Sequence, residues 1–208
     1  MKRLFIAEKR DIANAMADYL WPNGYEKTPH FYHNGDDSDC VTWASGHILR
    51  LALPNEYPEF KRDRINYPLF PSPWKLLPYK NMEAQLDAIG ALLKEYSVVV
   101  NGGDADREGQ LLVDEILNYY NYKGKRLRIF ITAKDDTSMK RAFDSIDDDE
   151  KYHALYVAGV VRDESDWLIG MNTSRAYNAE AQRSGYPVYG DFRFRIGRVK
   201  MPTLALIV

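Results

Sequence analysis

The chain has 208 residues, of which 45% are hydrophobic and 28% charged, and its net charge is −2. This is the composition of an ordinary globular protein, long enough for one large domain or for one domain and part of another. A single cysteine, Cys40, excludes a disulfide framework and a cysteine-rich zinc site, and the absence of an apolar run near the ~20 residues of a membrane span or of a signal peptide predicts a cytoplasmic protein without membrane contact.

Strands and helices alternate along the first half of the chain. Residues 2–7 contain consecutive apolar side chains that indicate a short buried strand, and Glu8 follows it. Apolar spacing over 11–20 predicts an amphipathic helix that ends at the Trp21-Pro22 turn. The next predicted elements are short strands near 30–33 and 41–44 around a turn at 34–37, an irregular segment with six prolines over 54–78, a helix over 82–96 and a buried strand over 97–100.

The second half continues this alternation after a turn at Gly102 and Gly103. We predict a helix over 110–120, a strand over 126–131, a helix over 137–146, a mostly helical segment over 152–181 and an extended segment over 187–194. Recurring strand, turn and helix predict an α/β fold with a parallel sheet flanked by helices. The acidic residues 147–150 suggest a boundary, so a domain over 1–150 and the start of a mainly helical domain over 151–208 are expected.

Charge is unevenly distributed along the chain. Residues 151–208 hold 8 Lys and Arg against 5 Asp and Glu, a balance of +3, whereas the other 150 residues hold 20 against 25, a balance of −5. A basic segment beside an acidic body fits phosphate contact on one side and metal binding on the other. An ordinary solvated surface would explain the same distribution.

Acidic side chains follow two predicted strands. Asp104, Asp106 and Glu108 come after the strand at 97–100, and Glu8 comes after the first strand. Ligands of open α/β sheets bind beyond the carboxyl ends of strands, so these carboxylates converge if the two strands are neighbours. Clustered carboxylates repel one another, and oxygen-only ligands favour Mg²⁺, Mn²⁺ or Ca²⁺. With a glycine-rich turn and a helix N-terminus that favour phosphate, the pattern predicts phosphoryl-transfer chemistry.

Two other interpretations use the same acidic residues. They could only cap the following helix and stabilise its dipole. Alternatively, the spacing from Asp104 to Glu115 nearly fits an EF-hand calcium loop. The β-branched segment 97–100 argues against calcium, because an EF-hand needs a helix there.

Five segments, in order and over nearly the whole chain, carry a family resemblance. They are Leu4-Phe-Ile-Ala-Glu-Lys9, Val41-Thr-Trp-Ala-Ser-Gly-His47, Asp104-Ala-Asp-Arg-Glu-Gly-Gln110, Arg162-Asp-Glu-Ser-Asp-Trp-Leu-Ile-Gly-Met-Asn172 and Ile196-Gly-Arg-Val-Lys-Met-Pro-Thr-Leu204. The Glu after a first strand and the Asp-x-Asp after a later one match the Toprim pattern that topoisomerases share with primases and some nucleases. Together the five segments resemble the type IA DNA topoisomerase family, its topoisomerase III branch in particular.

The resemblance implies a Toprim domain over 1–150 that helps to cleave and religate single-stranded DNA. Glu8 would act at the scissile phosphate and help bind the metal, and Lys9 would stabilise the charge that develops there. Asp104 and Asp106, assisted by Glu108, would hold Mg²⁺, with Mn²⁺ as a possible substitute. No Walker motif is present, so ATP is not expected.

The resemblance also implies that six further side chains serve the DNA or the polar surroundings of the site. Each has an ordinary alternative, such as a turn histidine, a surface helix pair or a solvated arginine. The six are His47, Gln110, Arg128, Arg162, Asp166 and Arg198.

The chain departs from the family in two residues and in what it lacks. Arg10 stands where the family usually has proline, and Lys200 where it has glutamine. None of the 15 tyrosines matches the motif of the nucleophile, and the chain ends in an apolar run over 203–208. We therefore expect a fragment, inactive alone, that works with further topoisomerase domains. A free-standing Toprim nuclease or primase-like protein, or a non-catalytic binding module, are the alternatives.

Overall fold

The computed structural model describes residues 2–35, 39–60, 68–189 and 193–208. It contains two compact units, Met1–Arg50 with Leu77–Val160, and Leu51–Leu76 with Val161–Val208. The grouping of residues 51–76 with the C-terminal segment is not visible in the sequence pattern. The domain division predicted near residue 150 stays a prediction.

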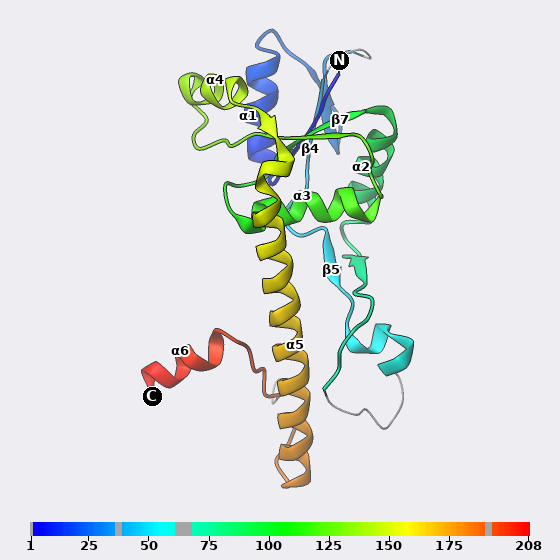
Figure 1. Ribbon diagram of the computed structural model, residues 1–208, viewed down its shortest axis with the longest axis vertical. Helices are drawn as coiled ribbons and strands as arrows, with labels where there is room; N and C mark the ends of the chain where they lie inside the picture. The colour runs from blue at the N-terminus through cyan, green and yellow to red at the C-terminus, as the bar shows by residue number, and fades with distance from the viewer. Residues whose placement is uncertain (1, 36–38, 61–67, 190–192) are drawn as a thin grey trace. The chain divides into compact units, whose positions relative to one another are not determined.

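A seven-stranded sheet forms the centre of the first unit (Figure 1). The strands are β1 (Leu4–Ala7), β2 (Glu26–Lys27), β3 (Phe31–His33), β4 (Cys40–Trp43), β7 (Val98–Gly102), β8 (Lys125–Arg128) and β9 (Asp147–Asp148). Their order is β2-β3-β4-β1-β7-β8-β9; the central β4, β1, β7 and β8 run parallel, and the outer strands pair antiparallel. This confirms the predicted α/β fold with a mainly parallel sheet.

Helices cover both faces of this sheet. They are α1 (Arg10–Leu20), α2 (Glu83–Glu95), α3 (Arg107–Tyr119) and α4 (Asp136–Asp144). Phe5 and Ala7 point to one face, where they pack in a single buried cluster with residues of α1 and α4. Thr42 of β4 points to the other face and accepts a hydrogen bond of 3.1 Å from Gln85 of α2. The alternation of apolar side chains in the strands therefore fixes a helix layer on each side.

Element boundaries differ from the predictions where side chains or register intervene. The helix predicted over 110–120 begins at Arg107, because the Asp106 carboxylate caps it. The strand predicted over 126–131 ends at Arg128, and β7 extends to Gly102. The two-residue strands β2 and β9 are too short to give a periodic pattern.

The second unit is built around a single tryptophan. Trp167 donates its indole N–H to the carbonyl of Ala52 at 2.8 Å and packs edge-on against Trp74, with ring centroids 5.3 Å apart. Asn172 is hydrogen-bonded to both the amide and the carbonyl of Leu69. These contacts hold the described parts of the proline-rich segment, residues 54–60 and 68–78, in place, and no long helix or strand occurs in those parts.

The short helix η3 (Asp149–Tyr152) belongs to the first unit. The remaining elements are the short helices η1 (Pro54–Glu56) and η2 (Pro58–Phe60), the ribbon of β5 (Leu49–Leu51) and β6 (Leu76–Pro78), α5 (His153–Arg183) and α6 (Lys200–Ile207). Parts of the predicted turn at 34–37, of the proline-rich segment 54–78 and of the extended segment 187–194 lie outside the described residues. Within the described residues, no helix has the length and apolar character to cross a membrane.

Candidate functional site

Glu8 and Asp104 meet at the carboxyl ends of two neighbouring parallel strands. In the register of β1 and β7, Ala7 is the partner of Gly102, so the residues that follow each strand lie side by side. The main-chain amide of Asp104 donates to Oε2 of Glu8 at 3.1 Å. Glu8 is only 9% exposed, so its carboxylate is held rather than free to sample solvent. The predicted convergence of these two stretches is present.

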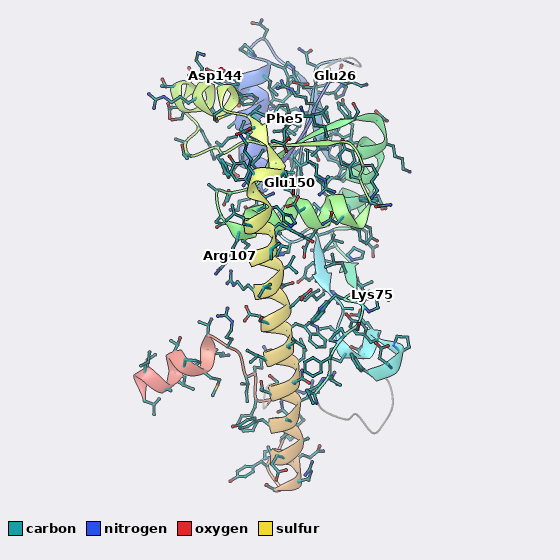
Figure 2. The ribbon with its side chains drawn as sticks, viewed as in Figure 1. Phe5, Glu26, Lys75, Arg107, Asp144 and Glu150 are labelled. Carbon is teal, nitrogen blue, oxygen red and sulfur yellow. The ribbon has the colours of Figure 1, made fainter. Side chains whose placement is uncertain are left out.

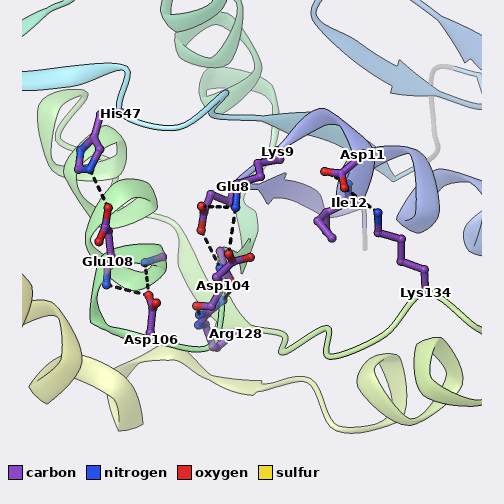
Figure 3. Close-up of polar contacts among 12 residues, drawn as sticks. Glu8, Lys9, Asp11, Ile12, His47, Asp104, Asp106, Glu108, Arg128 and Lys134 are labelled. Carbon is purple, nitrogen blue, oxygen red and sulfur yellow. Dashed lines mark hydrogen bonds and ion pairs between the residues drawn. The ribbon is translucent and has the colours of Figure 1, made fainter.

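Lys9 joins the two carboxylates. Its Nζ lies 2.9 Å from Oε1 of Glu8 and 3.2 Å from Oδ2 of Asp104 (Figure 3). The hydrogen bond to Glu8, and then that to Asp104, raise the pKa of Lys9 above its ordinary value, so the ammonium stays protonated. The positive charge of Lys9 thus partly neutralises the carboxylates of two predicted metal ligands, Glu8 and Asp104.

Arg128 is buried beneath the acidic loop, with 1% of its surface exposed. Its guanidinium donates to the carbonyls of Gly103 at 2.8 Å and Asp104 at 2.7 Å, and to that of Asn101 at 3.0 Å. Burial lowers the pKa of Arg128 to about 10, and the nearby Asp149 is the largest opposing influence. Arg128 was expected to contact DNA; the structure buries its side chain against the loop that carries Asp104, and a contact with DNA stays a prediction.

The two remaining acids of the motif lie at the start of α3. Oδ1 of Asp106 accepts from the amides of Glu108 at 2.9 Å and Gly109 at 2.8 Å, as an N-cap does. Oε1 of Glu108 lies 3.3 Å from Nε2 of His47, in the loop after β4. His47 is therefore at the predicted site, as a partner of an acidic side chain.

Glycines let the acidic loop pack against the first turn of α3. A Cβ on Gly103 would lie 2.1 Å from the carbonyl oxygen of Gly109, and a Cβ on Gly109 would lie 2.3 Å from the amide nitrogen of Asp104. These neighbours are backbone atoms that cannot move aside. The glycines are thus required for close backbone approach, with no demand for a left-handed conformation.

The donor set suits a hard divalent cation, but the side chains are not gathered as a cage. In the described parts of the chain, no three His, Cys, Asp or Glu residues are grouped to hold a metal ion. Glu8 and Asp104 face Lys9, while Asp106 faces the α3 amides. By chemistry the carboxylates still fit Mg²⁺, which binds through one or two carboxylates and retains water.

A buried acid pair lies behind α3. Nε2 of Gln110 donates to Asp114 and to Asp149, each at 2.9 Å, and all three residues are buried. Burial and then repulsion from Asp149 raise the pKa of Asp114 to about 6. Gln110, expected to serve the DNA or the polar surroundings of the site, is 0% exposed and connects α3 to η3, and its role toward DNA stays a prediction. Only the four-residue spacing of Gln110 and Asp114 on a helix hinted at this network.

The predicted DNA-contacting residues of the second unit form a group of their own. Asp166 accepts from Nε of Arg198 at 2.7 Å and lies 3.8 Å from Nε of Arg162 on the same helical face. The bond to Asp166 raises the pKa of Arg198. Asp166 therefore holds both arginines, and their contact with DNA stays a prediction.

The site combines a parallel sheet with a Glu after one central strand and an acidic, glycine-rich turn after the neighbouring strand. The Toprim domain family matches residues 3–132, and the chain belongs to this family.

The chain is also homologous over its length to DNA topoisomerase 3. It is 38% identical to that of Haemophilus influenzae over 212 residues, which are 99% of this chain and 32% of the relative. It is 37% identical to that of Vibrio cholerae, covering 100% of this chain and 32% of the relative. The chain thus spans about a third of these proteins, and the predicted family resemblance is confirmed.

A solved structure agrees on the fold. Full-length topoisomerase I from Thermotoga maritima matches 98% of this chain and 29% of its own, with a TM-score of 0.62 and 18% identity. At this identity the match supports the architecture and carries no residue roles.

Proposed function

We propose that this chain supplies the phosphate- and metal-binding centre of a type IA DNA topoisomerase, which cleaves one DNA strand transiently and religates it. The observation that carries the proposal is the Glu8–Lys9–Asp104 group at the ends of β1 and β7. Homology with DNA topoisomerase 3 supports the reaction class. The substrate would be single-stranded DNA of the nucleoid or of plasmids in the cytoplasm, and ATP would not be needed.

Each side chain has a role that its surroundings support. Glu8, nearly buried and bonded to the Asp104 amide, would take up and return a proton at the scissile phosphate. Lys9, kept protonated by its two carboxylate partners, would stabilise negative charge on the phosphate. His47 would orient Glu108.

Asp104, Asp106 and Glu108, with Glu8, would hold Mg²⁺ or Mn²⁺. The bound ion would supply charge to neutralise the phosphate oxygens. In this chain the carboxylates are oxygen donors of the right kind, and Arg128 keeps the loop that carries Asp104 in place. The nucleophilic tyrosine would come from another part of a longer protein, since relatives are about three times as long.

Magnesium titration of the 208-residue protein tests the metal assignment. Calorimetry with MgCl₂ alone should show binding that Asp104→Asn weakens by about tenfold or more. Asp144→Asn, an exposed acid of α4 paired with Lys140, is the matched control and should bind like the wild type. Equal affinity in all three proteins would remove the metal role.

Strand cleavage separates the topoisomerase from the alternative nuclease. With a labelled oligonucleotide and MgCl₂, the protein alone should leave the strand intact. Cleavage by these 208 residues that Asp104→Asn abolishes would favour a free-standing Toprim nuclease instead.

A further inference from the structure

Arg10 is an exposed arginine whose position is fixed by two buried aromatic residues. Its Nε donates to the hydroxyl of Tyr32 at 2.9 Å, and its guanidinium lies over the ring of Trp43, 5.0 Å from the centroid. Tyr32 and Trp43 are 1% and 3% exposed, and their own rings are 5.0 Å apart. A surface arginine usually samples many rotamers, whereas this one is held by a rigid platform.

This platform lies at the same edge of the sheet as the carboxylate site. Trp43, the last residue of β4, is the register partner of Ala7, which immediately precedes Glu8. The loop after β4 stays beside that segment, because the amide of Gly46 donates to the carbonyl of Glu8 at 3.2 Å. Arg10 is also the first residue of α1, a helix without a side-chain N-cap, so the helix end adds positive potential there.

The charge of Arg10 is not neutralised by the protein. Within the described ranges, no acidic side chain pairs with its guanidinium and no acceptor meets its two terminal nitrogens. Three other cations around the site are already engaged or buried. Lys9 serves Glu8 and Asp104, Lys134 pairs with Asp11 at 2.6 Å, and Arg128 is buried. A fixed guanidinium with two unused NH₂ groups is the geometry that recognises a phosphate group.

We propose that Arg10 binds a backbone phosphate of the DNA strand next to the one that Glu8 and Lys9 attend, as a strand-positioning contact. This rests on the proposed function, and it assigns a phosphate subsite to a residue outside the acidic motif. Tyr32 and Trp43 are positioning residues that act through Arg10. Phosphate, rather than a base, is the expected ligand. The guanidinium is anchored at Nε, so its two terminal nitrogens can donate to a pair of anionic oxygens.

Anisotropy with a short fluorescent single-stranded oligonucleotide, measured on the 208-residue protein with MgCl₂ over a series of salt concentrations, tests the inference. Arg10→Gln should weaken binding by about tenfold. It should also reduce the salt slope by about 0.7, the value for one lost phosphate contact on a single strand. Tyr32→Phe removes only the hydroxyl that anchors Nε, so it should weaken binding by a smaller factor, about threefold, and leave the slope nearly unchanged.

The matched control is Lys27→Gln. Lys27 is another exposed cation over aromatic rings of the same unit, 4.8 Å from the centroid of Tyr25 and 5.9 Å from that of Tyr32, but it does not follow β1. Its loss should change affinity by less than about twofold. Equal losses for Arg10→Gln and Lys27→Gln would show a general charge effect and overturn the inference, as would wild-type affinity in Arg10→Gln. Thermal unfolding of each variant confirms that the fold is retained.

Two further measurements identify the ligand and separate a failure of this inference from a failure of the proposed function. Inorganic phosphate should compete with the strand only weakly; tight competition would make this a free-phosphate site and overturn the strand assignment. Unchanged binding in Arg10→Gln, with magnesium binding still sensitive to Asp104→Asn, would overturn this inference alone. A wild type that binds neither strand nor magnesium would overturn both.

Discussion

The main-chain amide of Asp104 donates a hydrogen bond of 3.1 Å to Oε2 of Glu8, and so joins residues 96 positions apart in the sequence. Lys9 spans the same pair with its ammonium group. The three residues form one electrostatic unit in which a change at any member is felt by the others. Figure 2 labels Phe5 of β1, the strand that immediately precedes Glu8 and Lys9.

Replacing Glu8 should change the titration of its neighbour. The hydrogen bond to Glu8 is the largest influence that raises the pKa of Lys9, so Glu8→Gln should lower this pKa toward the ordinary lysine value of about 10.4. NMR of the Lys9 side chain across a pH series measures it. Asp11→Asn, which removes the partner of Lys134 instead, should leave Lys9 unaffected. An unchanged Lys9 titration in Glu8→Gln would contradict the unit.

Removing the guanidinium under the loop should destabilise the fold. Arg128→Gln leaves several buried carbonyls without a donor, and we expect a loss of about 3 kcal/mol in the free energy of unfolding. Urea denaturation measures this loss. Lys125→Gln, at an exposed position of the same strand, should change stability by less than about 0.5 kcal/mol. A similar small effect at both positions would argue that Arg128 does not hold the loop.

A methyl group at Gly109 should disturb the acidic loop. Its Cβ would lie 2.3 Å and 2.4 Å from the amide nitrogen and carbonyl oxygen of Asp104, so Gly109→Ala should cost about 3 kcal/mol or prevent folding. Gly170 lies in the interior of α5, where the nearest atom to an added Cβ is 3.7 Å away. In Gly170→Ala the free energy of unfolding should stay the same or rise by up to about 1 kcal/mol. Denaturation of the pair decides the matter, and a stable Gly109→Ala protein with normal magnesium affinity would refute the close packing.

The buried acid pair should give stability an unusual pH dependence. Burial raises the pKa of Asp114 from 3.8 to about 6, so the folded state holds a proton that the unfolded state releases. The contribution is full below about pH 4 and is lost as pH rises through 6, with a slope of up to about 1.4 kcal/mol per pH unit.

Asp114→Asn should reduce this slope, because the amide stays neutral and can still accept from Gln110, while burial still raises the pKa of Asp149. Urea midpoints between pH 4 and 7 measure it, with Asp144→Asn on the surface of α4 as control. Parallel pH profiles for Asp114→Asn and wild type would show that Asp114 titrates normally.

Much of the fold could be predicted because it is encoded locally. The apolar run before Glu8 and the Val98–Val100 run are buried strands, and the apolar spacing after Arg10 is helix α1, as expected. The acidic motif also identified the sheet edge that carries the site. The internal detail of the site could not be predicted. With Asp106 as its N-cap, α3 begins before the first residue of the apolar pattern. A cap acts through hydrogen bonds to backbone amides, and hydrophobic spacing does not report these bonds.

The sequence by itself determined the order of strands and helices, the α/β class and the acidic residues, because burial periodicity and motif spacing are properties of neighbouring residues. Only the tertiary structure decided which distant groups meet: Lys9 between two carboxylates, Arg128 buried under the Asp104 loop, and Arg10 held over Trp43. The physical reason is that the residues next to a charged side chain in the sequence do not determine which group it will pair with. Its partner is chosen by strand register and packing across the whole sheet.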